Sequence, residues 1–85
     1  MEITGKIKVL NETQTIGGNG FRKREVVITT EDQYLQYILV EFIQDKCDLL
    51  NGYTIGQDVK IDINLRGREW VNPEGISKYF NAIQG

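Results

Sequence analysis

The sequence predicts an all-β domain, and two observations support this prediction. Apolar residues alternate with polar residues along several segments, which is the period of a strand that buries one face. Turn-forming runs separate these segments, with Gly-Gly-Asn-Gly at 17–20 and Asn-Pro-Glu-Gly at 72–75. A chain of 85 residues has room for one small hydrophobic core. We therefore expect a single domain over residues 1–85.

The first strand begins almost at once, because Ile3, Ile7 and Val9 recur at odd positions between polar neighbours. Gly5 lies inside this pattern and indicates a bend or a bulge. The run 17–20 follows, and its three glycines and one asparagine tolerate positive φ. This run predicts a hairpin-type loop after the first strand.

The second strand covers residues 21–30, which begin polar and end in β-branched residues. Val26 and Ile28 share one face of this strand with two cations, Arg22 and Arg24. The alternation therefore gives one side of the strand an apolar end, suited to the core, and a charged end.

A polar turn, a third strand and a short helix follow. Glu-Asp-Gln at 31–33 predicts the turn, and the alternation over about 36–44 predicts the strand. Residues 45–50 are too few for periodicity to identify a helix. However, Asp45 is a suitable N-cap and Asn-Gly at 51–52 is a suitable C-terminal stop. We therefore expect one or two helical turns.

The fourth strand has the strictest alternation, with apolar residues at every second position over 59–65. A long hairpin connection over 67–77 and a last strand over 78–83 complete the chain. In an open sheet, these five strands would leave long unpaired edges. We therefore predict a closed barrel. Three strands, a helix and two strands is the order of the five-stranded OB-fold.

Composition excludes several classes of chemistry. Ten Lys and Arg face twelve Asp and Glu, a net charge of −2, so any nucleic-acid site must come from local clustering of cations. The chain has no histidine, which excludes histidine acid–base chemistry. Its one cysteine, Cys47, cannot form an internal disulfide, and no Cys/His set exists for zinc. No charged leader precedes an apolar stretch, so we expect a cytoplasmic protein with no membrane association.

We expect no catalysis. Two carboxylate pairs, Asp45 with Asp48 and Glu31 with Asp32, are more simply interpreted as parts of a helix cap and a polar turn. The glycine-rich run 17–20 lacks the Lys-Ser/Thr of a phosphate loop and precedes a strand. We therefore predict no catalytic residue, no metal site, no cofactor and no small-molecule substrate.

Cations and aromatic residues gather near the face that an OB-fold uses for binding. That face consists of strands two and three with the loops after strands one and four. Single-stranded nucleic acid requires rings for base stacking and cations for phosphates. The candidate residues that meet these needs are Arg22, Lys23, Arg24, Tyr34, Tyr37, Arg66, Arg68, Trp70 and Tyr79.

Other roles stay open for some of these apolar groups. Trp70 either stacks on bases, covers one end of the barrel or packs in a dimer interface, while Phe21 and Phe42 are expected in the core. Some apolar residues exceed the needs of one small core, which is typical of a partner surface. These residues are Leu39, Ile43, Val71 and Ile76. We therefore expect a homo-oligomer, in the form of a dimer.

The chain resembles a small family of bacterial proteins of unknown function over nearly its whole length. The segments that carry this resemblance are 5–7, 21–28, 40–42, 45–47, 59–75 and 79–81. The stretch 59–75, with its Gly-Arg, Trp and Gly order, is also similar to single-stranded-DNA-binding proteins and to the primosomal OB-fold protein related to them. This more distant resemblance implies an OB-fold, nucleic-acid binding, and pairing through strand one or the long hairpin.

We therefore predict a non-catalytic protein that binds single-stranded nucleic acid, with DNA as the expected ligand. Aromatic stacking and phosphate contacts on the barrel would provide the binding. The alternative is an OB-fold module for protein–protein interaction or oligomerisation without nucleic-acid binding. The acidic balance of the composition favours this alternative.

Overall fold

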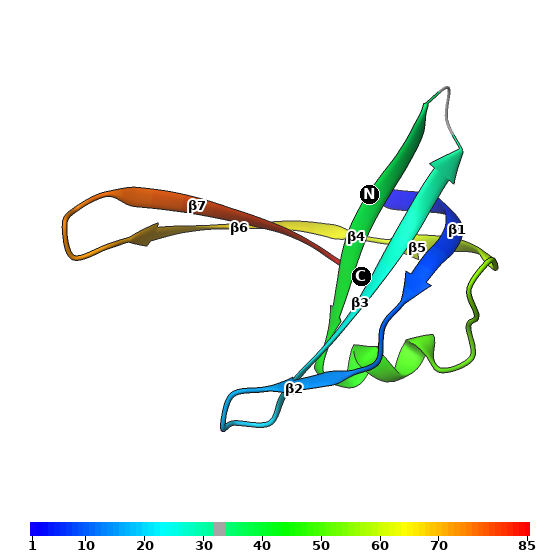
Figure 1. The fold of residues 1–85 in the computed structure, drawn as a ribbon, viewed down its shortest axis with the longest axis horizontal. Helices are drawn as coiled ribbons and strands as arrows, with labels where there is room; N and C mark the ends of the chain where they lie inside the picture. The colour runs from blue at the N-terminus through cyan, green and yellow to red at the C-terminus, as the bar shows by residue number, and fades with distance from the viewer. Residues whose placement is uncertain (32–33) are drawn as a thin grey trace.

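The computed structural model describes residues 1–31 and 34–85, which form strands and one short 3₁₀ helix (Figure 1). In chain order, the elements are β1 (Glu2–Leu10), β2 (Gln14–Ile16), β3 (Phe21–Glu31), β4 (Leu35–Ile43), η1 (Gln44–Leu50), β5 (Asp58–Asp62), β6 (Asn64–Val71) and β7 (Ser77–Gln84). The prediction of an all-β domain with one short helix after the third long strand is confirmed.

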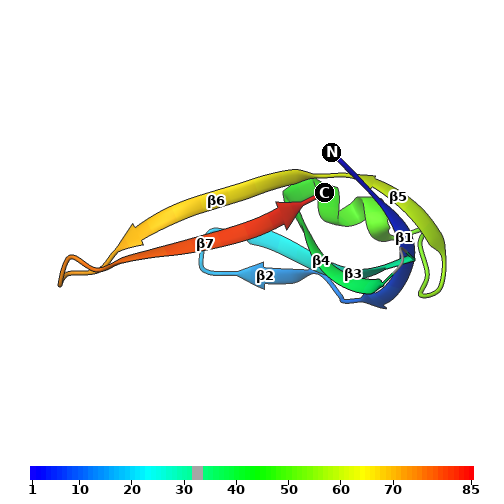
Figure 2. The same ribbon diagram turned by 90° about the horizontal axis from the view of Figure 1, so that it is seen from above.

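One curled sheet contains all the strands, in the order β5-β1-β3-β4-β7-β6, with β2 paired to β3. Neighbours are antiparallel except β4 and β7, which are parallel and meet at Glu41 and Gln84. The two ends of this order, β5 and β6, are separated in sequence by Ile63 alone. The sheet therefore curls into a half-barrel, from which β6 and β7 extend as a long arm (Figure 2).

The strands differ in number from the five that the sequence predicts, for two reasons. Residues 14–16 form β2, a separate short strand that pairs with the start of β3. The predicted fourth strand divides at Ile63, because its first half pairs with β1 and its second half pairs with β7. The N–H of Ile63 leaves the ladder and donates to the carbonyl of Met1 at 2.8 Å.

The core lies between the inner faces of β1, β3, β4 and β5. Its buried apolar residues are Ile3, Ile7, Val26, Ile28, Val40, Phe42, Leu50 and Ile63, so the prediction for Phe42 is confirmed. Gly5 permits β1 to approach β3 closely, because a Cβ there would collide with the carbonyl oxygen of Thr29. The bulge in β1 lies elsewhere, between Ile7 and Val9, where its pairing with β3 shifts.

The helix η1 lies across one end of β3 and β4 (Figure 1). Its N-cap is Ile43, with no side-chain cap, so the prediction that Asp45 is the N-cap is wrong. Cys47 is fully buried, and its thiol donates to the carbonyl of Phe42 at 3.3 Å. The predicted turn 31–33 lies mostly outside the described residues. Among the described residues, no helix is long and apolar enough to cross a membrane.

Candidate nucleic-acid interface

The hairpin of β6 and β7 projects from the body along the longest dimension of the molecule, which is 45 Å (Figure 1). Every residue of β6 is exposed. The prediction of a loop over 67–77 is wrong for residues 67–71, because these residues continue β6. Its turn is confirmed at Gly75, whose N–H donates to the carbonyl of Asn72 at 2.9 Å.

The register of this hairpin sorts its side chains onto two different faces, because paired residues of a ladder share a face. The pairs Arg66–Ala82, Arg68–Phe80 and Trp70–Lys78 form what we call the cationic face. The pairs Leu65–Ile83, Gly67–Asn81, Glu69–Tyr79 and Val71–Ser77 form what we call the apolar face. All three cations in these pairs, Arg66, Arg68 and Lys78, therefore lie on one side of the ribbon.

On the cationic face, rings and guanidinium groups lie next to each other. The Cζ atom of Arg68 lies 5.4 Å from the centre of the Phe80 ring, a cation–π distance. The Nε of Arg66 donates to Oε1 of Gln84 at 3.3 Å. Trp70 keeps 47 % of its surface exposed further toward the tip. The face therefore offers two flat rings, Phe80 and Trp70, beside three positive charges.

A cleft of about 470 Å³ separates the root of the cationic face from the outer face of β3 and β4. Its other side is closed by Ile16 of β2 and Phe21 of β3, in the ribbon of β2 and the start of β3 that we call the β2 arm. The remaining lining residues are Lys23, Glu41, Ile43, Arg66, Gly67, Arg68, Phe80, Asn81, Ala82 and Gln84. Phe21, predicted in the core, is instead half-buried in this cleft.

An ion pair occupies the floor of the cleft. Nζ of Lys23 lies 3.2 Å from Oε2 of Glu41, and both side chains are largely buried. The amide of Gln84 donates to Oε1 of Glu41 at 3.1 Å. Because Glu41 is the one carboxylate among the described lining residues, the cleft carries more positive than negative charge.

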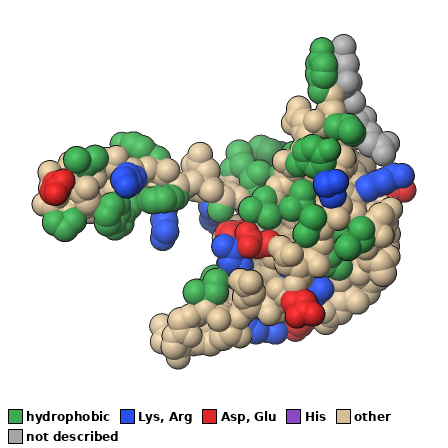
Figure 3. Space-filling model, viewed as in Figure 1, with side chains coloured by type: hydrophobic (Ala, Val, Ile, Leu, Met, Phe, Trp, Pro, Cys, Tyr) green, Lys and Arg blue, Asp and Glu red, His purple; other side chains and the backbone are tan. Residues whose placement is uncertain are grey.

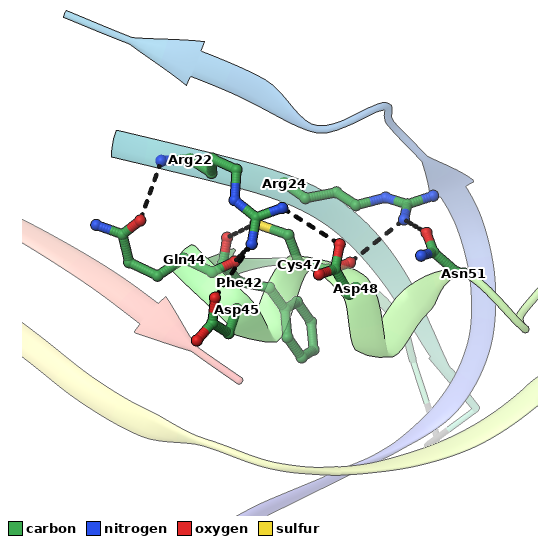
Figure 4. A network of polar contacts seen from close by, with 8 residues as sticks. All are labelled: Arg22, Arg24, Phe42, Gln44, Asp45, Cys47, Asp48 and Asn51. Atoms are coloured by element: carbon green, nitrogen blue, oxygen red, sulfur yellow. Dashed lines mark hydrogen bonds and ion pairs between the residues drawn. The ribbon is translucent and has the colours of Figure 1, made fainter. Parts of the chain in front are cut away.

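Arg22, which was predicted to meet phosphates, faces η1 at the end of the half-barrel (Figure 4). Its guanidinium lies 3.3 Å from a carboxylate oxygen of Asp45 and 3.3 Å from one of Asp48, and it donates to the carbonyl of Gln44 at 3.1 Å. The hydrogen bond to Asp48 and the negative charge of that residue raise the pKa of Arg22 above its ordinary value. This guanidinium therefore remains charged and holds η1.

Arg24 lies on the same face of β3 and binds two backbone carbonyls and one side chain. It donates to the carbonyl of Asn11 at 2.8 Å, to that of Cys47 at 3.3 Å, and to the side chain of Asn51 at 2.9 Å (Figure 4). The prediction that Arg22 and Arg24 share a face with Val26 and the core is confirmed, since Val26 is fully buried. That shared face directs both arginines away from the cleft.

The three predicted tyrosines lie apart from one another. Tyr34 lies in the bend before β4 and is 74 % exposed. Tyr37 lies on the outer face of β4, with Nζ of Lys8 at 5.2 Å from its ring centre. Tyr79 lies on the apolar face of the hairpin, opposite Glu69 and on the other side from Trp70. The predicted set is therefore divided between several surfaces.

Sequence reasoning did not select Phe80 and Lys78 for the site. Both lie on the cationic face, opposite Arg68 and Trp70. The signal that could have identified them is the even spacing of Arg66, Arg68 and Trp70 across Gly67, which has the period of a strand.

Comparison with protein families gives one match. A model for a domain of unknown function, DUF3127, matches residues 2–85. The chain belongs to the DUF3127 family. The resemblance to a family of unknown function is thereby confirmed, while the more distant resemblance to single-stranded-DNA-binding proteins stays a prediction. No curated protein matches this DUF3127 chain.

Proposed function

We propose that this DUF3127 domain is an OB-fold barrel that binds single-stranded nucleic acid, preferably DNA, without catalysing a reaction. The strand order supports the fold. If β5 and β6 are counted as one bent strand, then β1, β3, β4, the bent strand and β7 make five, with η1 after the third. The binding surface of an OB-fold then corresponds to the outer face of β3 and β4, between the β2 arm and the hairpin.

The observation that carries the proposal is the cationic face next to the cleft. Arg66, Arg68 and Phe80 line the cleft, with Arg68 over the Phe80 ring, and Trp70 continues the same face outward. Binders of single strands combine cations that follow the phosphates with rings that stack on successive bases. Lys23 on the floor and Phe21 on the opposite wall add one further group of each kind.

Local charge supports binding in spite of the net charge of −2. Asp45 and Asp48 lie on η1, where each forms an ion pair with Arg22 at 3.3 Å, away from the cleft. Glu69 lies on the apolar face of the hairpin. The acidic balance of the chain thus arises mostly from other surfaces, and a phosphate backbone in the cleft would meet Glu41 alone among the described lining carboxylates.

The alternative function, a protein-interaction module, is favoured by the apolar side chains on the other face of the hairpin. Leu65 is 62 % exposed and Tyr79 is 71 % exposed there. The two functions require different faces of the same hairpin. Measurements on variants of each face can therefore distinguish between them.

The test is the fluorescence anisotropy of a labelled oligo-dT, titrated with the protein at low and at moderate salt. We expect binding at about 10 µM or below at low salt, weakened as salt rises, because phosphate contacts release counterions. Trp70→Ala should weaken binding by about 1–3 kcal/mol, the usual contribution of one stacked base.

Tyr79→Ala is the matched control, since it removes an exposed ring from the opposite face of the same hairpin. Its affinity should equal that of the unmodified protein. Absence of binding at low salt would reject the proposal. Equal losses in the two variants would reject the assignment of binding to the cationic face.

A further inference from the structure

Four polar side chains form a connected network across the floor and one wall of the cleft. Oε2 of Glu41 lies 3.2 Å from Nζ of Lys23, and Oε1 of Glu41 accepts a hydrogen bond from Nε2 of Gln84 at 3.1 Å. Oε1 of Gln84 in turn accepts one from Nε of Arg66 at 3.3 Å. β3, β4, β7 and β6 are neighbours in the sheet in this order, and each contributes one of these side chains. We call this set the cleft network.

The cleft network lies where the hairpin joins the body. Glu41 and Gln84 are the one pair of described residues that joins β4 and β7 in the ladder. The N–H of Gly85 donates to the carbonyl of Glu41 at 3.0 Å beside this pair. Figure 3 shows acidic and basic side chains next to each other at this junction, at the edge of the hollow between the hairpin and the β2 arm. The network therefore connects the body to the hairpin.

Gln84 connects the two halves of the network through the two ends of its amide. An ionised carboxylate only accepts hydrogen bonds, so the amide nitrogen of Gln84 faces Glu41. The amide oxygen is then left to accept the bond from Arg66. Glu41 thereby sets the orientation of the amide, and the amide in turn fixes the position of Nε of Arg66.

This bond leaves the phosphate-binding end of Arg66 available. A guanidinium is a planar fork that matches two phosphate oxygens, and Arg66 uses Nε for Gln84. In the part of the chain that the structure describes, its two terminal nitrogens form no ion pair. A side chain that is already held in place loses less rotamer freedom when a ligand binds, and this raises the affinity.

We propose that Gln84 is a positioning residue for the binding of single-stranded nucleic acid. It holds Arg66 in the wall of the cleft, so that the terminal nitrogens of Arg66 meet a phosphate, and it makes no contact with the strand itself. The proposal rests on the proposed function, because it concerns the same cleft. It adds an uncharged residue, in contact with an acidic one, to a site that the cations alone would otherwise define.

Anisotropy titrations with oligo-dT measure the effect of Gln84→Met, which retains every cation of the site. We expect binding to weaken about three- to tenfold, because Arg66 must then be immobilised by the ligand. The slope of log K against log salt should stay unchanged, since the phosphate contact is still made. Arg66→Met removes that contact, and it should reduce the slope by about 0.7. Gln57→Met is the matched control, because Gln57 accepts a hydrogen bond from the N–H of Thr54 outside the cleft.

The double variant shows whether Gln84 acts through Arg66. In the Arg66→Met protein, the further change Gln84→Met should cause no additional loss of affinity, because the group that Gln84 positions is already absent. An additional loss as large as that in the single variant would overturn the proposal. Gln84 would then contact the nucleic acid itself or would only shape the cleft.

Arg66→Lys is a second variant with an exposed position, and it keeps the charge without the Nε–H group. It should weaken binding about as much as Gln84→Met and leave the salt slope unchanged, because the phosphate contact remains without its fixed geometry. A reduced slope in Arg66→Lys would contradict this role of the Nε–H group. Circular dichroism checks that each variant is folded.

NMR relaxation of the Arg66 Nε–H group tests the positioning without any nucleic acid. Its order parameter should be about 0.8 in the free protein and fall below about 0.6 in Gln84→Met. Equal values in the two proteins would overturn the positioning role, whether or not oligo-dT binds. If oligo-dT does not bind to the unmodified protein, the proposed function fails, and the order parameters still decide whether Gln84 holds Arg66.

Discussion

Glu41 is the residue on which the charge of the cleft depends most directly. It holds Lys23 at 3.2 Å on the floor, where a phosphate would compete for the same ammonium group. Its cross-strand neighbour is Glu25, so two carboxylates lie opposite each other in the ladder. Lys23 offsets this repulsion in the free protein, and binding of a phosphate would have to replace part of that interaction.

Glu41→Gln should therefore increase the affinity for oligo-dT, because it frees Lys23 for a phosphate. Each additional phosphate contact steepens the dependence of log K on log salt by about 0.7 for a single strand. Salt titrations of both proteins by anisotropy measure this slope. Glu2→Gln is the control, since it removes the same charge beside Lys60, whose Nζ lies 3.1 Å from Oε2 of Glu2. An unchanged slope in Glu41→Gln would show that Lys23 does not contact phosphate.

At the scale of elements, η1 depends on β3 for its position. Residues 44–50 form a short 3₁₀ helix with no side-chain cap, which has little stability by itself. Arg24 supplies hydrogen bonds to the carbonyl of Cys47 and to the side chain of Asn51, at the middle and end of this segment. β3 thereby fixes the helix that closes the end of the core.

Arg24→Met should lower the free energy of unfolding by about 1–3 kcal/mol, because it leaves a partly buried carbonyl without its donor. Urea denaturation measures this loss. Arg22→Met should cost less, since the contacts that it removes are exposed. Neither substitution should change the affinity of the folded protein for oligo-dT. If Arg24→Met lowered the affinity for oligo-dT without lowering the stability, Arg24 would instead be a residue that contacts the nucleic acid.

The strands that bury a face could be predicted from the sequence, whereas the continuation of β6 through residues 67–71 could not. In 21–30 and 59–63 apolar residues alternate with polar ones because one face of each strand is buried. Val26, Ile28 and Ile63 are buried, as this alternation predicts. β6 buries none of its residues, so Arg66 to Val71 show no apolar period. Likewise, the contacts of Arg24 span 23 and 27 residues to Cys47 and Asn51, and only the folded chain brings these segments together.

The residue types of the candidate site could be predicted from the sequence. Their arrangement in space depends on the register of β6 and β7, which the sequence does not show. Lys23, Arg66 and Arg68 do line one cleft. Trp70 and Tyr79 are both exposed rings on the hairpin, and the sequence alone does not show that they lie on opposite faces. A shift of one residue in the pairing would exchange these faces, which is why register decides between the two kinds of partner.

At the scale of the whole molecule, the hairpin borders two clefts that meet on the outer face of β3 and β4. Arg66, Arg68 and Phe80 line the first cleft, and Leu65 and Ile83 line the second. Both clefts include Lys23 and Glu41, so this ion pair lies where the two clefts meet.

The most direct test of this account is an NMR titration of the ¹⁵N-labelled protein with oligo-dT at low salt. The largest shifts should fall on the amides of Lys23, Arg66 and Arg68 and on the indole N–H of Trp70, while Tyr79 and η1 should change little. If the largest shifts fell on η1 or on the apolar face, or if no signal moved, binding in this cleft would be contradicted.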